Sequence, residues 1–358
     1  MNALQEHFSA KGLGRVFLLS LLADLVIRPF GQGRASTAQQ MIPAALLTTA
    51  VTLALTAPLL SMARQAVLNP AEGGVPGVQK LLRCGLLGLL TVLFAMGGGE
   101  GIVRAGGFLR YVSADPLADG VVYVLLLAAC AYAMWCGPQA QARAAGPLLC
   151  LFFASAALVI ISNAGAMRPE NLPAQPFDAV AVAETALNGF RFPAELALFF
   201  FFAAPAEGNL LRHYRQSLWG LCFVYIALTL TAGLVLGSQM QAQSQPVHTL
   251  ARLGHLSVFR RLDALHDGVW TLAALAKAAA FASGLRQAAG LLLPQRRRRW
   301  AGGCALAALA AGTCACASLP YAAAEGILTV LTALAMGAMG MLGALYTKGG
   351  AGHGCQTA

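Results

Sequence analysis

The chain has 358 residues, of which 58% are hydrophobic and only 11% are charged, whereas soluble proteins carry about 25% charged residues. This composition excludes an ordinary soluble globular protein, and a large soluble helical core would show polar stripes along its helices. The net charge of +10 does not predict nucleic-acid binding, because the Lys and Arg residues lie mainly between apolar segments, where they determine membrane topology.

Apolar segments of about the length of a membrane-spanning helix recur along the whole chain. We predict an all-α polytopic membrane protein that forms one integral-membrane domain over residues 1–358. The ten predicted spans are 14–32, 41–62, 80–98, 119–136, 145–163, 188–206, 216–237, 264–286, 300–318 and 326–346.

The connections between these segments predict the orientation of the chain. If the N-terminus is cytoplasmic, the inner segments hold fourteen Lys and Arg residues and the outer segments hold nine, which places both termini inside. Residues 164–187 are predicted to be a long polar outer connection, and 238–263 another, with a short helix lying along the surface. The basic run Arg296 to Arg299 either binds anionic membrane lipid or only anchors the topology.

Two predicted spans are interrupted by proline. The first contains Asp24 followed by Arg28-Pro29-Phe30-Gly31, and the sixth opens on Arg191-Phe192-Pro193-Ala194-Glu195. Proline removes a backbone donor, so both helices should break or kink, unless Pro29 and Pro193 mark helix ends at the membrane surface.

Ten spans divide into two halves of five, so the two interrupted spans occupy corresponding positions. We predict a 5+5 bundle of the leucine-transporter type, with repeat one over about 14–163 and repeat two over about 188–346, inverted because each half has an odd number of spans. A ligand would bind between broken helices one and six. The predicted ligand-binding residues are Asp24, Arg28, Pro29, Gly31, Arg191, Pro193 and Glu195.

Several charged residues are predicted to lie at membrane depth, where charge is costly and usually functional. Asp24 either binds a cation, a proton or a substrate amine, or pairs with Arg28 on the same helix face. Glu195 either contributes to the site or stabilises a helix N-terminus. Glu100 and Arg104 are expected to form a structural ion pair at a helix break after Gly97-Gly98-Gly99.

Asp263, Trp270 and Lys277 are spaced by seven residues and should lie along one stripe of the eighth span, with a coupling or structural role. Lys277 lies about two-thirds along that span. Its ammonium would occupy a cation position, titrate or pair with a carboxylate such as Asp24. The alternative is that Lys277 extends its amine to the cytoplasmic surface.

The sequence shows no sign of enzymatic chemistry. Its histidines have no metal-ligand spacing, the nine cysteines lie mostly inside apolar runs as packing residues, and Gly97 to Gly99 lacks the context of a dinucleotide site. We therefore predict no catalytic residues, no metal and no cofactor.

Four motifs, in order over residues 110–285, resemble the membrane B subunits of bacterial endospore germinant receptors. These subunits are permease-like members of the amino acid–polyamine–organocation transporter superfamily. In chain order, the motifs are Arg110-Tyr-Val-Ser-Ala-Asp-Pro116, Cys136-Gly-Pro-Gln-Ala-Gln-Ala-Arg143, Pro169-Glu-Asn-Leu-Pro173 and Phe259-Arg-Arg-Leu-Asp-Ala-Leu with Trp270.

The resemblance implies a membrane subunit that senses a small nutrient, often an amino acid, and couples its binding to germination. Its partners would be a larger membrane A subunit and a lipoprotein C subunit in the spore inner membrane, with the C subunit near 164–187 and 238–263. Two other functions stay open from the residues. One is a proton-coupled amino acid transporter in which Lys277 or Asp24 handles the proton, and the other is a purely structural subunit.

Overall fold

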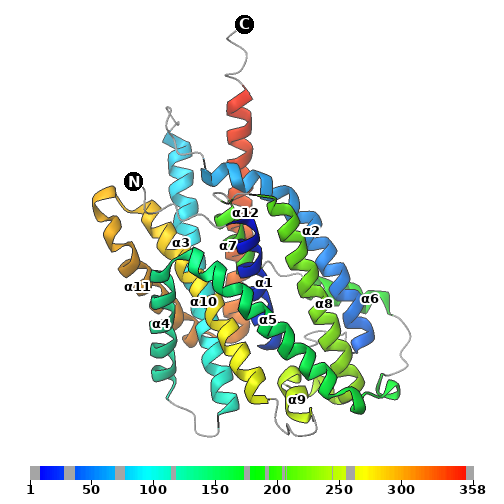
Figure 1. The fold of residues 1–358 in the computed structure, drawn as a ribbon. Helices are drawn as coiled ribbons and strands as arrows, with labels where there is room; N and C mark the ends of the chain where they lie inside the picture. Colours follow the sequence, from blue (N-terminus) through cyan, green and yellow to red (C-terminus); the bar gives the residue numbers. More distant parts are fainter. Residues whose placement is uncertain are drawn as a thin grey trace.

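The computed structural model describes residues 9–27, 37–68, 77–113, 118–172, 178–189, 193–203, 206, 208–243, 245–254 and 263–351. Within these ranges the chain is a helical bundle without a β-strand (Figure 1). The α-helices are α1 (Ala10–Ile27), α2 (Ala38–Leu68), α3 (Gly77–Val112), α4 (Asp119–Cys136), α5 (Pro138–Ser162), α6 (Ala179–Gly189), α7 (Ala194–Ala203), α8 (Leu210–Leu236), α9 (Pro246–Leu253), α10 (Asp263–Leu292), α11 (Ala301–Ser318) and α12 (Tyr321–Ala351). Four 3₁₀ turns accompany them: η1 (Ala164–Ala166), η2 (Pro169–Asn171), η3 (Gly237–Gln241) and η4 (Gln295–Trp300).

Eight of the described helices are long and apolar enough to cross a membrane, namely α2, α3, α4, α5, α8, α10, α11 and α12. The outside of the bundle is apolar as well, since Val124, Leu125 and Tyr132 on α4 expose more than half of their surface. Apolar side chains on both the inner and the outer face are typical of helices surrounded by lipid. The prediction of a polytopic helical membrane protein is therefore confirmed.

The region around the predicted sixth span differs from the sequence prediction. The predicted polar connection 164–187 contains η1, η2 and most of α6, and the predicted span 188–206 is helical in the last two residues of α6 and in α7 among its described residues. Helix α6 forms because Val182 and Ala186 pack with Ala44 of α2, while Thr48 donates a hydrogen bond to the Ala186 carbonyl at 3.2 Å. The apolar face of α6 is too short to be recognised in the sequence as a membrane-spanning segment.

The helix break predicted after Gly97-Gly98-Gly99 is wrong, because α3 runs without interruption from Gly77 to Val112. These glycines serve close packing instead. A Cβ atom on Gly99 would lie 2.4 Å from the backbone carbon of Gly312 on α11, and one on Gly312 would lie 2.2 Å from the Ala95 carbonyl oxygen. Helices α3 and α11 thus pack backbone against backbone.

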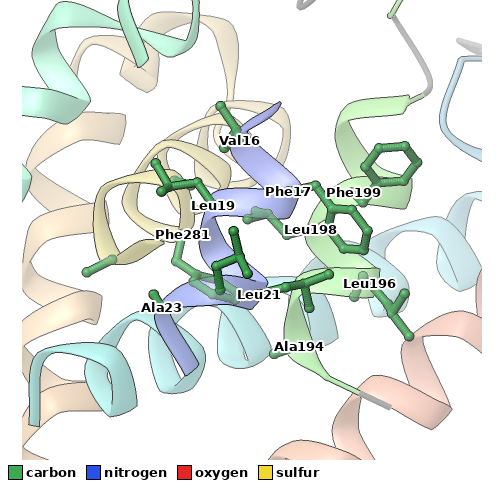
Figure 2. Packing of buried hydrophobic residues seen from close by; sticks show 14 of the residues in the cluster. Val16, Phe17, Leu19, Leu21, Ala23, Ala194, Leu196, Leu198, Phe199 and Phe281 are labelled. Atoms are coloured by element: carbon green, nitrogen blue, oxygen red, sulfur yellow. The ribbon is translucent and has the colours of Figure 1, made fainter. Parts of the chain in front are cut away.

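Helix α10 lies at the centre of the bundle and packs against α1, α3, α4, α5, α7, α9 and α11. Most of its buried residues are small (alanine, glycine or serine), which lets these neighbours approach closely. Helices α1 and α7 pack side by side next to it, joined by the rings of Phe17 and Phe199 at 4.8 Å between centroids (Figure 2). Phe281 of α10 lies in the same apolar layer.

The ends of the helices fall into two groups. The starts of α1, α5 and α8 lie together, since a Cβ on Gly12 would contact Ala142 and one on Gly14 would contact His213. At the same end, Arg286 of α10 donates a hydrogen bond to the Met134 carbonyl of α4 at 2.8 Å, and the basic turn η4 follows α10.

At the other end, the segment after α5 meets the segment after α8. The Arg168 amide donates to the Leu234 carbonyl at 3.0 Å, and Asn163 donates from its side chain to the Leu250 carbonyl of α9 at 2.9 Å. Helix α9 is the short helix predicted within 238–263, although much of it is buried rather than lying freely on the surface.

Candidate functional site: a buried charged cluster

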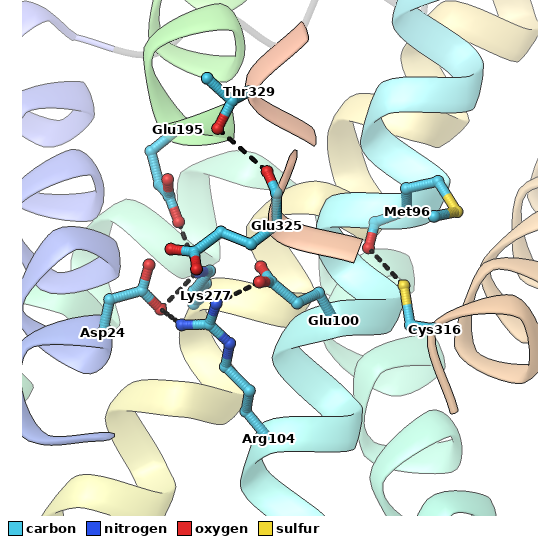
Figure 3. Close-up of polar contacts among 9 residues, drawn as sticks. All are labelled: Asp24, Met96, Glu100, Arg104, Glu195, Lys277, Cys316, Glu325 and Thr329. Carbon is cyan, nitrogen blue, oxygen red and sulfur yellow. Dashed lines mark hydrogen bonds and ion pairs between the residues drawn. The ribbon is translucent and has the colours of Figure 1, made fainter. Parts of the chain in front are cut away.

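Six charged side chains from five helices meet inside the bundle (Figure 3). We call this set the charged cluster; its members are Asp24 (α1), Glu100 and Arg104 (α3), Glu195 (α7), Lys277 (α10) and Glu325 (α12). Each is less than one-tenth exposed. Isolated charges cannot be kept in such an environment without partners, so the cluster depends on its mutual pairing.

Lys277 connects two helix ends that are far apart in the sequence. Its ammonium nitrogen lies 2.5 Å from Asp24 Oδ1 and 2.5 Å from Glu195 Oε1. Asp24 lies three residues before the end of α1, and Glu195 lies in the first turn of α7. One amine on the central helix therefore holds α1 and α7 together.

Arg104 forms the second positive centre of the cluster. Its Nη2 donates to Glu100 Oε1 one turn earlier on α3, and its Nη1 lies 3.7 Å from Asp24 Oδ1. The guanidinium also lies over the ring of Tyr321, 4.7 Å from the ring centre. Asp24 Oδ1 is thus shared between the two positive groups of the cluster.

Helix geometry places the members of the cluster. Trp270 and Lys277 are two turns apart on one face of α10, and the Trp270 indole donates to the Ala23 carbonyl of α1 at 2.9 Å. This bond satisfies a carbonyl in the last turn of α1 and fixes the height at which Asp24 meets Lys277. On α7, the Leu196 amide donates to the Pro193 carbonyl at 2.9 Å, which sets the turn carrying Glu195.

The structure brings together three of the residues predicted from the sequence, Asp24, Glu195 and Lys277. The predicted pairing of Lys277 with Asp24 is confirmed. The alternative that Lys277 reaches the surface is wrong, because the residue is only 2% exposed and its amine points into the cluster. The predicted ion pair of Glu100 and Arg104 is also confirmed, although in an unbroken helix.

Other predicted site residues lie elsewhere. Pro193 is half-buried just before α7, and Trp270 supports α1 as described. Asp263 lies at the start of α10, four turns from Lys277, where its side chain accepts the Ala264 amide at 3.0 Å. The predicted residues Arg28, Pro29, Gly31 and Arg191 lie outside the described residues.

Glu325 and the role of Arg104 were missed by the sequence analysis. Glu325 is the single charged residue between Tyr321 and Gly343, and it was assigned to the connection just before the tenth predicted span. The signal that could have identified Glu325 is a lone carboxylate at the start of an apolar segment. Figure 3 shows the Glu325 side chain directed toward Lys277 and Arg104.

Among the described residues, the cluster combines four carboxyl groups with one ammonium and one guanidinium. Within the described ranges, no three His, Cys, Asp or Glu side chains are close enough to hold a metal ion.

A second polar group lies between the cluster and α9. His248 of α9 pairs through Nδ1 with Asp267 Oδ1 of α10 at 2.9 Å, and its ring packs edge-on against Phe108. Phe108 in turn packs against Trp270, with 4.0 Å between ring centres. A continuous set of contacts thus links α9 to the end of α1.

No protein-family model matches the sequence, and no curated protein matches it either.

Proposed function

We propose that the chain is a permease-like membrane subunit that binds a small nutrient between α1 and the α6–α7 region and reports its binding to a germinant receptor. The observation that carries the proposal is the Lys277 ammonium, which holds carboxylates next to both interruptions at 2.5 Å each. A ligand that competes for these carboxylates would change how α1 and α7 are held. Ligand binding shifts a conformational equilibrium only through such differential contacts.

The helix packing supports two related halves of five helices. We match α1 with α6–α7, α2 with α8, α3 with α10, α4 with α11 and α5 with α12. When both helices of a packed pair are replaced by their matches, the result is in most cases another packed pair. The pairs related in this way are α1–α8 and α7–α2, α1–α10 and α7–α3, α5–α10 and α12–α3, α3–α11 and α10–α4, α2–α12 and α8–α5, α3–α4 and α10–α11, and α1–α5 and α7–α12. A chance bundle would not follow this rule, so we propose the 5+5 inverted repeat.

The resemblance of four motifs to germinant-receptor B subunits supports the sensing role. In this proposal the partners are the receptor A and C subunits in the spore inner membrane, and amino acids are the first nutrients to test. Both termini would lie on the cytoplasmic side with the basic turn η4. The C subunit would then contact the opposite end, where η1, η2 and α9 gather.

A proton-coupled amino acid transporter is the second candidate, favoured by one observation. A buried amine held by two carboxylates can exchange a proton when one ion pair breaks. The same site serves both functions, and they differ in whether the ligand crosses the membrane.

The test compares Asp24→Asn, Glu195→Gln and Lys277→Met with the native chain in spores of the native host and in proteoliposomes. The sensing function predicts altered germination in response to one nutrient class, with no uptake of that nutrient by proteoliposomes of the native chain. The transport function predicts uptake that the variants lose. Unchanged germination and absent uptake, with normal amounts of protein in the membrane, would contradict both. Lys11→Met is the matched control, because Lys11 is exposed.

A further inference from the structure

The short turn η4 concentrates positive charge at one end of the bundle. It carries four consecutive arginines, Arg296 to Arg299, within six residues. Among the described residues none of the four forms an ion pair, and the Nε atom of Arg298 is buried without a hydrogen-bond acceptor. Like charges so close together repel one another, and a buried donor without an acceptor is costly, so an anion that supplies acceptors would stabilise η4.

The helices around η4 supply no such anion. The sequence contains neither Asp nor Glu between Gly268 and Ala324, and neither between Gly120 and Pro169. Helices α4 and α10 therefore carry their acidic residues only near their starts, at the opposite end of the bundle, and α5 and α11 carry none. The balancing negative charge has to come from outside these four helices.

Two exposed tryptophans lie beside the arginines. Trp300 ends η4 and Trp135 lies in the last turn of α4, and each is 60% exposed. A Cβ atom on Gly302 would lie 3.9 Å from Trp135 Nε1, so Trp135 borders the start of α11. Exposed tryptophans on membrane helices are typical of the level of the lipid headgroups. We therefore expect the arginines of η4 to lie at the level of the lipid phosphates.

We propose that η4 binds the phosphate of an anionic phospholipid, with Arg296 and Arg299 as the principal donors. Side chains three residues apart lie on the same side of a 3₁₀ helix, so these two exposed guanidiniums can bind one phosphate together. Arg299 also lies over the ring of Trp300, 5.7 Å from the ring centre, which restricts its orientation. This inference is independent of the proposed nutrient site.

The apolar surface next to η4 favours a lipid over free phosphate. Leu291 and Leu292, just before the turn, are 41% and 40% exposed, and Tyr132, one turn before Trp135 on α4, is 73% exposed. The acyl chains of a lipid bound at η4 would cover this surface. A zwitterionic lipid such as phosphatidylcholine would bring its own cation to the arginines, so the headgroup should be anionic.

The test measures thermal unfolding of the purified full-length chain in detergent, with phosphatidylglycerol, phosphatidylcholine or inorganic phosphate added at equal phosphate concentration. Phosphatidylglycerol should raise the midpoint of unfolding in a saturable manner, whereas phosphatidylcholine and inorganic phosphate should leave it nearly unchanged. Native mass spectrometry with an equimolar mixture of the two lipids should show preferential retention of phosphatidylglycerol.

Variants link the binding to η4. Arg296→Gln with Arg299→Gln should weaken the binding of phosphatidylglycerol by about tenfold or more, because two headgroup-level charges are lost. Arg296→Lys with Arg299→Lys keeps these charges but loses the planar donors, so its loss of affinity should be smaller. The matched control is Arg212→Gln with Arg215→Gln, which removes two exposed arginines, also three residues apart, from α8 at the same end of the bundle, and its affinity should stay unchanged.

Several outcomes would overturn the inference. Equal stabilisation by phosphatidylcholine would remove the preference for an anionic lipid, and equal stabilisation by inorganic phosphate would replace the lipid with a soluble anion. An equal loss of affinity in the α8 control would reduce the effect to a general attraction by the basic end. Native affinity in both η4 variants would leave the turn as a topology anchor only. Thermal unfolding without lipid verifies that each variant is folded.

Discussion

At the scale of single residues, the notable feature is a lysine that belongs to two ion pairs. Lys277 is 2% exposed on a helix whose residues Ala273, Ala274 and Ala278 are also buried, and its amine reaches only the carboxylates of Asp24 and Glu195 among the described ion pairs. Removing one member of a buried pair leaves an uncompensated charge, which costs more than the pair contributes. The stability of the bundle should therefore depend more on whether the buried charges are paired than on how many buried charges it contains.

Lys277→Met is expected to destabilise the protein by about 3–5 kcal/mol, because Asp24 and Glu195 lose their shared cation while the volume of the side chain is kept. The triple variant Asp24→Asn, Glu195→Gln, Lys277→Met should recover most of that loss. Thermal unfolding in detergent measures both. If the triple variant were less stable than Lys277→Met alone, the three residues would not act as one charge-matched unit.

At the scale of elements, two glycines of α3, Gly98 and Gly99, determine how closely α3 and α11 approach. The Gly99 backbone meets the Gly312 backbone of α11, and Gly98 faces Leu309 one turn earlier on that helix. A methyl group at Gly99 has no flexible side chain to displace, because the nearest atoms are backbone atoms. Such sites tolerate no added carbon without movement of a whole helix.

Gly99→Ala should destabilise the bundle by about 1–3 kcal/mol or more, through separation of α3 and α11. Gly85→Ala is the matched control on the same helix, since a Cβ atom there meets nothing within 4 Å, and it should be neutral or slightly stabilising. The midpoint of thermal unfolding and the monodispersity in detergent report the difference. Equal midpoints for the two variants would contradict the close packing.

Much at this scale could be predicted from the sequence, for identifiable reasons. Apolar length located the spanning helices, and the charges Asp24 and Lys277 stood out because they interrupt apolar segments. The unbroken course of α3 could not be predicted, because Gly97 to Gly99 weaken a helix locally, and their packing against α7, α10 and α11 involves residues far away in the sequence. Glu325 belongs to the cluster because α12 packs on α3, and no local sequence pattern predicts a contact between residues so far apart in the chain.

At the scale of the whole molecule, the helix ends divide into a basic end and an end of mixed charge, where Arg168 and Glu170 lie in or next to η2 and Arg110 pairs with Asp119. The basic end carries Arg286 and the arginines of η4, and the other end carries η1, η2 and α9. In bacterial membranes the basic end of a helical protein faces the cytoplasm. The basic end should therefore be cytoplasmic in this protein as well.

Single cysteines at the two ends test this orientation. Gly165→Cys in η1 and Gln295→Cys in η4 both place the new thiol at an exposed position. In intact cells a membrane-impermeant maleimide should label Gly165→Cys above the level of the native chain, and should label Gln295→Cys only after the membrane is broken. The reverse pattern would invert the assignment, and equal labelling of both in intact cells would contradict a transmembrane arrangement.

The position of Lys277 also means that one side chain secures two helices independently. When its amine leaves Asp24, the contact with Glu195 still connects α7 to the central helix, and when it leaves Glu195, α1 stays connected. Loss of one ion pair therefore does not free both helices, and complete loss of the charge pairing on α10 takes two steps.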